Sequence, residues 1–271
     1  MSSGAPWLAE LGLARELADV ADKISMSYFS KDPETSMKAD GSLVTIADQQ
    51  IEQAIRARIR DAFPEHAILG EEAGLEGDPQ GPIWIVDPID GTNNYSLGIP
   101  IFATLIALRK DGTTRMGVVS APALGERYEA AEDTGARMNG KAIRVSSVAS
   151  LGDAGVCIGS YRRMVRYGYG EGLERIMSVC RRDRGFGDFW GHMLVARGSV
   201  EVMAEPNLNI WDVAALEVIV KEAGGRTSGF GGRPYPESRI RTNDEDASFL
   251  STNGALHDEI LALLGESGTA A

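Results

Sequence analysis

Cysteine is scarce in this chain of 271 residues, which contains only Cys157 and Cys180. Two cysteines do not make a disulfide framework, so the composition fits a reducing compartment. No N-terminal stretch combines basic, apolar and small-residue regions, and no apolar run approaches the length of a transmembrane span. We therefore expect a globular protein of the cytoplasm that does not use a membrane as a partner.

Positive charge is also in short supply, because 27 Lys and Arg residues face 39 Asp and Glu residues, for a formal net charge of −12. Nucleic acids and anionic membranes attract basic surfaces, so this balance argues against both as partners. The three histidines, His66, His192 and His257, are too scattered for a zinc site. An acidic protein that handles phosphate needs a local positive charge, and a metal ion would supply it.

The most informative stretch begins with the apolar residues 83–86, which predict a buried strand. Pro88 fixes its own φ and biases Asp87 toward an extended conformation, so we expect the strand to bend there. Asp87 and Asp90 then present two carboxylates, and oxygen ligands suit Mg²⁺. If residues 91–92 open a short helix, their amides could hold a phosphate against that metal.

Two other interpretations of this stretch exist. The first is an ordinary turn between a strand and a helix, with Asp90 as the N-cap and Asp87 in solvent. The second is a calcium-binding EF-hand loop, but its spacing does not match. Counted from Asp87, the third position is Ile89 and the twelfth is Gly98 instead of glutamate. The rest of the chain must distinguish a turn from a metal site.

Acidic residues elsewhere each have a simple local explanation. Asp48 opens an expected helix near residues 47–63, where the helix dipole favours a carboxylate. Glu71 follows an expected short strand at residues 66–69, as in a solvated loop. Asp212 sits at the first turn of another expected helix, where an N-cap is usual. However, neighbouring strands that end together would gather their carboxylates, which is costly without a cation.

Periodicity and turn residues divide the chain near residue 149. The N-terminal region, residues 1–148, is expected to pack two helices on an antiparallel or mixed sheet, and the C-terminal region, residues 149–271, to alternate helices and strands. In the N-terminal region we expect helices at 6–28 and 47–63 and strands at 66–69, 83–86, 102–108, 116–120, 127–131 and 142–145. In the C-terminal region we expect helices at 187–195, 211–223 and 256–264, strands at 200–205 and 249–252, and loops at 167–172 and 229–246.

Three motifs in this order resemble the inositol monophosphatase family of Mg²⁺-dependent, Li⁺-sensitive phosphatases. They are Gly70-Glu71-Glu72, then the stretch from Asp87 to Tyr95, then Trp211-Asp212-Val213-Ala214-Ala215 followed by Glu222-Ala223-Gly224-Gly225. The resemblance implies an α+β or α/β fold, a layered αβαβα sandwich. It also implies two or three Mg²⁺ ions per site, inhibition by Li⁺, a small-molecule phosphate monoester as substrate, and a homodimer.

The resemblance also implies roles for individual residues. The metal ligands would be Glu71, Asp87, the backbone carbonyl of Ile89, Asp90 and Asp212. Asp87 would bridge two ions, and the backbone amides of Gly91 and Thr92 would bind the phosphate. A hydrogen-bonded pair of Thr92 and Asp48 would orient the attacking water, with Glu71 close by.

The second half is most similar to the histidinol-phosphatase branch of that family, in the segments 187–189, 194–196 and 204–206. Glu205 matches the position where inositol phosphatases hold a sugar hydroxyl, and Asp188 matches a small, uncharged position there. Histidinol phosphate carries an ammonium and an imidazole, so a second carboxylate favours it over inositol phosphate. Asn93 is the third expected substrate-binding residue, and it stands where many members of this branch have Lys. Residues 156–183 follow no recognised pattern.

The expected function is Mg²⁺-dependent hydrolysis of L-histidinol phosphate to L-histidinol and phosphate, a reaction of histidine biosynthesis. The alternative is an inositol-1-monophosphatase or a broad-specificity phosphatase of sugars and polyols. A more distant alternative is a regulator that binds phosphate or metal without catalysis. In each case the central expectation is the same: four acidic side chains, far apart in the sequence, meet at one cation site.

Overall fold

The chain divides into two compact units in the computed structural model, which describes residues 7–29, 35–37, 43–234 and 248–265. Unit 1 comprises residues 1–141 and Ile210–Ile219, and unit 2 comprises the remainder. Residues 210–219 thus belong to the N-terminal unit, whereas the predicted boundary at residues 148–149 places them in the C-terminal region. The division into residues 1–148 and 149–271 stays a prediction. No helix in the described ranges is both long and apolar enough to cross a membrane.

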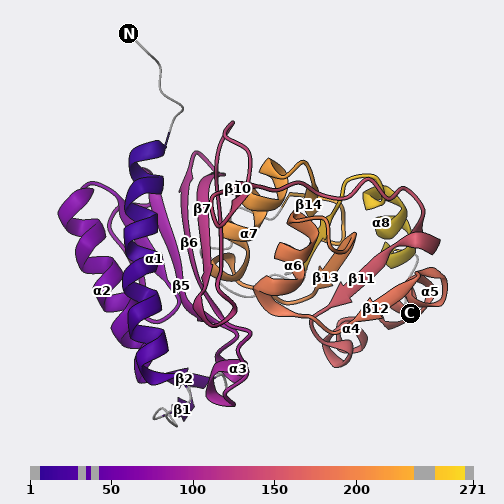
Figure 1. Ribbon diagram of the computed structural model, residues 1–271, viewed down its shortest axis with the longest axis horizontal. Coiled ribbons are helices and arrows are strands. Elements are labelled where there is room, and N and C mark those ends of the chain that lie inside the picture. Colours follow the sequence, from indigo (N-terminus) through magenta and orange to yellow (C-terminus); the bar gives the residue numbers. More distant parts are fainter. Residues whose placement is uncertain (1–6, 30–34, 38–42, 235–247, 266–271) are drawn as a thin grey trace. The chain divides into compact units, whose positions relative to one another are not determined.

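Unit 1 is built on an eight-stranded mixed sheet in the order β10-β9-β8-β7-β6-β5-β3-β4 (Figure 1). Strands β3 and β5 are parallel, and the other pairs for which registers are known are antiparallel. The sheet strands are β3 (Ala67–Gly70), β4 (Gly74–Glu76), β5 (Ile83–Asp90), β6 (Ala103–Lys110), β7 (Thr113–Ala121), β8 (Glu126–Ala131), β9 (Arg137–Met138) and β10 (Lys141–Ala142). A separate pair joins β1 (Thr35–Met37) to β2 (Leu43–Thr45).

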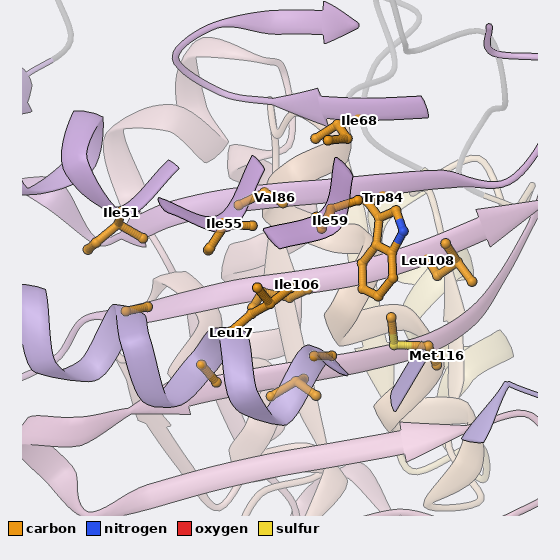
Figure 2. Packing of buried hydrophobic residues seen from close by; sticks show 14 of the residues in the cluster. Leu17, Ile51, Ile55, Ile59, Ile68, Trp84, Val86, Ile106, Leu108 and Met116 are labelled. Atoms are coloured by element: carbon orange, nitrogen blue, oxygen red, sulfur yellow. The ribbon is translucent and has the colours of Figure 1, made fainter. Parts of the chain in front are cut away.

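Helices α1 (Leu8–Tyr28) and α2 (Ile46–Ala62) lie side by side against one face of this sheet (Figure 1). Apolar residues at helical spacing give each helix a buried stripe. The stripe of α2 (Ile51, Ile55 and Ile59) and Leu17 of α1 meet Trp84 of β5 and Ile106 of β6 (Figure 2). Each of these side chains is fully buried.

The first ten residues of helix α7 (Ile210–Glu222) belong to unit 1, and Ala215 and Val218 of this helix lie against Gly117 of β7. Successive side chains of a strand point to opposite faces. Met116 and Val118 of β7 belong to the core under α1 and α2, so Gly117 between them faces away from those helices. A Cβ atom at Gly117 would stand 2.9 Å from Ala215 Cα, so the missing side chain lets α7 approach the sheet. Unit 1 is therefore layered as helix, sheet and helix.

Unit 2 contains a five-stranded mixed sheet in the order β12-β11-β13-β15-β14. Its strands are β11 (Gly155–Ile158), β12 (Arg182–Arg184), β13 (Val202–Glu205), β14 (Arg226–Ser228) and β15 (Phe249–Thr252), and its helices are α4 (Tyr161–Arg166), α5 (Gly170–Val179), α6 (Asp188–Ala196) and α8 (His257–Gly265). One apolar cluster joins α5 and α8 to one face of this sheet. A second cluster, around Met203, joins α6 to the other face. The α+β layered fold expected from the sequence is confirmed.

The predicted elements match the structure closely, with three corrections. Residues 142–145 do not form a strand, because β10 contains only Lys141–Ala142. The expected loop at 167–172 is wrong from Gly170 onward, where α5 begins. The strand expected at 83–86 is longer than predicted, because β5 continues through a bulge to Asp90. Much of the expected loop at 229–246 and of the polar segment at 31–41 lies outside the described residues.

Candidate active site

Two neighbouring parallel strands, β3 and β5, bring the first acidic side chains together. The register pairs Gly70 with Val86, so Glu71 and Asp87 follow the last paired residues of the two strands. The amide of Glu71 donates to the carbonyl of Val86 at 3.2 Å. Parallel strands that end at the same level place the next side chains at one edge of the sheet. The juxtaposition of two acids predicted from the sequence is thus present.

A bulge in β5 shapes the acidic corner that follows. Asp87 is in register with Leu105 of β6, and Asp90 is in register with Ala103, so the two residues between the aspartates have no register partner in the ladder. Pro88 is one of these two, and a proline, which lacks an N–H, fits where no ladder bond is made. The carbonyl of Pro88 accepts a hydrogen bond of 2.7 Å from the hydroxyl of Thr104. Asp87 is buried, with 2% of its surface exposed.

The third stretch contributes Asp212 from the first turn of α7. Asp87, Asp90 and Asp212 each offer a carboxylate oxygen, and these oxygens lie within 4.8 Å of one another. All three residues belong to unit 1. Groups that are far apart along the chain therefore share one small volume. The N-cap and turn explanations do not account for this convergence.

The pKa of Asp87 responds to the three-carboxylate cluster and also to Glu71 and Asp48, which lie outside that 4.8 Å group. Burial raises the pKa of Asp87 well above its usual value, and the negative charges of Glu71, Asp90, Asp212 and Asp48 raise it further. Each of these groups therefore opposes ionisation of the buried carboxyl. A bound divalent cation would reverse the balance, since it favours the charged form of every carboxylate around it.

The donor set fits a hard divalent cation. The Oδ1 atom of Asp87 is buried and has no hydrogen-bond partner among the described residues. A buried carboxylate oxygen without a partner is costly, and a metal ion would satisfy it. All donors are oxygens, which suits Mg²⁺ better than the softer metals that prefer nitrogen and sulfur.

Asp48 is held at the start of α2 by Thr45, which precedes the helix. Asp48 Oδ2 accepts hydrogen bonds from the Thr45 amide at 2.8 Å and from the Thr45 hydroxyl at 2.6 Å. The Thr45 hydroxyl oxygen in turn accepts hydrogen bonds from the Ala47 and Asp48 amides. These reciprocal bonds form a capping box at the start of α2. Burial raises the pKa of Asp48 to about 7, against these hydrogen bonds, and the charges of Glu72 and Glu71 add to the rise. The helix-dipole explanation and proximity to the acidic cluster therefore both apply to Asp48.

The expected hydrogen bond between Thr92 and Asp48 is not formed in the described part of the chain. The Thr92 hydroxyl has one proton, and it donates this proton to the carbonyl of Ile89 at 2.9 Å. Asp48 directs one oxygen at Thr45, and its Oδ1 atom has no hydrogen-bond partner among the described residues. The pairing implied by the family resemblance is corrected here: each group has another arrangement, and the Ile89 carbonyl, an expected metal ligand, binds Thr92.

Gly91 connects the acidic corner to helix α3 (Thr92–Ser96). Its φ of 84° is in the left-handed region, and a Cβ atom there would lie 2.9 Å from the carbonyl oxygen of Ile101. Only glycine fits this position without strain. The short helix expected after Asp90 is therefore present, and the exposed side chain of Asn93 lies in its first turn.

Two of the three expected substrate residues, Asp188 and Glu205, belong to unit 2. Asp188 is the first residue of α6 and has a φ of 55°, which is uncommon for aspartate. Glu205 ends β13, is 3% exposed, and lies 3.7 Å from the guanidinium of Arg163. A Cβ atom at Gly159 would stand only 2.0 Å from Glu205 Oε1, so the glycine makes room for this carboxylate.

The histidines have structural partners instead of catalytic ones. His66 accepts a hydrogen bond from the indole of Trp84 at 3.1 Å. His192 and His257 are both buried, and burial lowers the pKa of each, to about 3 and about 4. His192 Nδ1 lies 2.8 Å from the hydroxyl of Ser251. Neutral imidazoles bonded to neutral hydroxyls fit a packing role.

Sequence reasoning missed Glu52 on α2, whose carboxylate is 2% exposed and accepts hydrogen bonds from the amides of Glu72 and Ala73. On a helix of polar and apolar residues, a Glu52–Arg56 pair four positions apart suggests a solvated ion pair. The available signal was position: Glu52 adjoins Ile51 on the apolar stripe and follows Asp48 by one helical turn.

Comparison with known proteins agrees with this arrangement. Residues 9–269 match the model of the inositol monophosphatase family. The chain is 41% identical to a histidinol-phosphatase of Streptomyces coelicolor over 96% of this chain and 98% of that protein. It is 40% identical to a histidinol-phosphatase of Mycobacterium tuberculosis over 94% and 97% of the two chains. The solved structure of an IMPase from Thermotoga maritima superposes with a TM-score of 0.83 at 32% identity, over 96% of this chain and 98% of that one. The chain therefore belongs to the inositol monophosphatase family.

Proposed function

We propose that this protein is a Mg²⁺-dependent phosphomonoesterase and that its substrate is L-histidinol phosphate, which it hydrolyses to L-histidinol and phosphate. The observation that carries the proposal is the cluster of Asp87, Asp90 and Asp212 oxygens within 4.8 Å of one another in a chain of this family. Relatives at 41% and 40% identity that are named histidinol-phosphatases support the choice of substrate.

The metal would be held by Asp87, Asp90 and Asp212, with Glu71 and the carbonyl of Ile89 completing the oxygen set. When bound, Mg²⁺ supplies a Lewis acid that lowers the pKa of water and neutralises the charge that develops on the leaving oxygen. Asp87, the most buried of these four carboxylates, would be the ligand shared by two ions. Because Mg²⁺ sites also share phosphate oxygens of the substrate, few protein ligands are needed for each ion.

The residues around the acidic corner would position the reacting groups. The amides of Gly91 and Thr92 begin helix α3, and the first amides of a helix have no acceptor within it, so they can donate to phosphate oxygens. Asp48 Oδ1 has no hydrogen-bond partner among the described residues, so this oxygen can accept a proton from a nearby water. Phosphoryl transfer requires mainly positioning and charge neutralisation, and no protein nucleophile.

Asp188, Glu205 and Asn93 are proposed to select the substrate. Histidinol phosphate presents an ammonium group, which two carboxylates favour, whereas inositol presents neutral hydroxyls. Glu205 Oε1 already lies 3.7 Å from the Arg163 guanidinium, so this oxygen faces a cation in this structure. A substrate ammonium at Glu205 would replace one charged partner with another.

A steady-state assay of phosphate release tests this function. Turnover of L-histidinol phosphate is expected only with Mg²⁺, to stop on addition of EDTA, and to decrease with Li⁺. The Asp87→Asn and Asp212→Asn variants are expected to stay folded and to lose at least about 100-fold in kcat, because each removes a negative ligand of the cation that would stabilise the transition state. An active Asp212→Asn variant would contradict its role as a ligand.

The second candidate is hydrolysis of inositol 1-phosphate, which the likeness to the Thermotoga maritima IMPase favours. A comparison of kcat/KM for the two substrates decides between them. Asp188→Ala is expected to lower kcat/KM for histidinol phosphate by about 10- to 100-fold, since hydrogen bonds to charged groups contribute about 1.5–3 kcal/mol. The same variant is expected to change inositol 1-phosphate turnover little. Equal losses on both substrates would contradict the proposed ammonium pocket.

We also propose that the protein works as a homodimer in the cytoplasm, which family membership supports. Light scattering of the purified protein measures the assembly directly. A single monomeric species at micromolar concentration would contradict the homodimer.

A further inference from the structure

The turn between β3 and β4, residues 71–73, is hydrogen-bonded to the Glu52 side chain of helix α2. Glu52 Oε2 accepts a hydrogen bond from the Glu72 amide at 2.8 Å, and Glu52 Oε1 accepts one from the Ala73 amide at 3.0 Å. One carboxylate thus binds two successive amides of the turn. Glu71, the residue just before these amides, is the one assigned to the metal.

Arg56, one helical turn after Glu52, fixes the carboxylate and the far end of the same turn. Its guanidinium donates to Glu52 Oε1 at 2.8 Å, to the Gly74 carbonyl, and to Glu76 at 3.1 Å. Arg56 is 4% exposed and Glu52 is 2% exposed, so this ion pair is buried. A buried charge pair adds little net stability compared with apolar residues, but its hydrogen bonds impose a definite geometry.

Gly70 is shaped for this contact. A Cβ atom at Gly70 would stand 2.3 Å from Glu52 Oε1 and 2.4 Å from Glu52 Cδ. Any larger residue would therefore push the carboxylate away from the turn. Gly70 ends β3 and is followed directly by Glu71. The strand end and the helix side chain are thus complementary at the residue that precedes the acidic cluster.

From these contacts we infer that Glu52 is a positioning residue for the metal site. It fixes the backbone of residues 71–73, so that the Glu71 carboxylate stays beside Asp87, where its charge already acts on the Asp87 carboxyl. Arg56 holds Glu52 in place. This inference rests on the proposed function through the assignment of Glu71 to the metal. Groups that orient metal ligands without touching the ion contribute about 10–100-fold to metal affinity.

Direct metal binding tests the inference without an activity assay. The probe is Mn²⁺, titrated by calorimetry into the full-length protein, with the melting temperature of the metal-free protein measured in parallel. Glu52→Gln replaces one oxygen by an NH₂ group, which cannot accept from a turn amide. We expect the dissociation constant of Mn²⁺ to rise by about 10–100-fold in this variant. Glu76→Gln is the matched control, because Glu76 contacts Arg56 but not the amides of the turn, and its dissociation constant is expected to stay within about twofold of the wild-type value.

A second pair of variants tests the same contact between Glu52 and the turn by changing Gly70, at the end of strand β3. Gly70→Ala is expected to weaken Mn²⁺ binding as Glu52→Gln does, whereas Gly12→Ala, with no atom within 4 Å of its added Cβ, is expected to leave it unchanged. Should Glu52→Gln fail to fold, Gly70→Ala decides the question. Wild-type Mn²⁺ affinity in a folded Glu52→Gln or Gly70→Ala variant, with only the melting temperature lowered, would overturn the positioning role. A wild-type protein that binds no Mn²⁺ would instead overturn the proposed function, and the positioning role with it.

Discussion

Replacement of Asp87 by asparagine is expected to stabilise the metal-free protein while it removes metal binding. The carboxylate oxygens of Asp87, Asp90 and Asp212 lie within 4.8 Å of one another, and Asp87 is buried. At an effective dielectric constant of about 20, two unit charges at that distance repel by about 3 kcal/mol. Without a cation, the folded state therefore bears a cost that an asparagine side chain, which is neutral and similar in shape, would not have.

The size of the gain follows from how far protonation already relieves the repulsion. The raised pKa of Asp87 shows that the carboxyl gains a proton more easily than usual, so part of the repulsion is removed near neutral pH. We take a net gain of about 1–3 kcal/mol at pH 8, below the full Coulomb repulsion. For proteins of this size, 1 kcal/mol corresponds to about 2–4 °C in Tm, so the metal-free variant should melt roughly 3–10 °C higher than the wild type.

Addition of Mg²⁺ is expected to reverse the order of the two melting temperatures, so that the wild type melts higher than Asp87→Asn. At a concentration about 100 times the dissociation constant, Mg²⁺ should stabilise the wild type by about 2.7 kcal/mol and the Asp87→Asn variant hardly at all. Differential scanning fluorimetry in EDTA and in Mg²⁺ measures both changes. Asp78→Asn is the matched control, since it removes the same charge from an exposed loop. An Asp87→Asn variant that behaves like Asp78→Asn in EDTA would refute the electrostatic argument.

Three further predictions concern packing and burial. Gly117→Ala should lower the free energy of unfolding by about 1–3 kcal/mol and weaken Mn²⁺ binding in calorimetry. The reason is that the new Cβ would stand 2.9 Å from Ala215 Cα and displace helix α7, which carries Asp212. Unchanged Mn²⁺ binding would show that α7 does not move. His192 stays neutral in the folded state because burial lowers its pKa to about 3. In the unfolded state the same imidazole takes up a proton below its ordinary pKa of about 6.5. The free energy of unfolding therefore falls as pH decreases, by up to about 1.4 kcal/mol per pH unit between pH 6.5 and 5. Urea unfolding across this range should show a smaller slope for His192→Gln, and an equal slope would contradict the burial argument. Tyr95→Phe should cost about 0.5–1.5 kcal/mol in urea unfolding, because the buried hydroxyl donates to a carbonyl of α1 at 2.7 Å, and no loss would mean that this bond adds nothing.

Much of unit 1 follows from local sequence signals. The apolar run at residues 83–86 and the proline after Asp87 predict a buried strand that changes course at an acidic corner, and the structure has a strand with a bulge there. Glu71 and Asp87 could be placed side by side because two neighbouring strands end in acids. The buried stripe of α2 is present as its periodicity predicts.

Other features depend on tertiary contacts that no local pattern encodes. Asp212 has an ordinary local role at a helix start, and only the packing of α7 on Gly117 brings it near Asp87. Glu52 looks like half of a solvent-exposed ion pair, and only the turn at residues 71–73 gives it buried donors. The hydroxyl of Thr92 donates its one proton to the carbonyl of Ile89, a residue inside the bulge of β5, so this contact depends on a strand irregularity that the sequence pattern does not predict.

The most direct measurement of the central claim is anomalous diffraction from crystals of the wild-type protein soaked in Mn²⁺, a common substitute for Mg²⁺. The account predicts an anomalous peak in direct contact with the carboxylate oxygens of Asp87, Asp90 and Asp212. Crystals that release phosphate in Mn²⁺ but show no peak at these three side chains would contradict it.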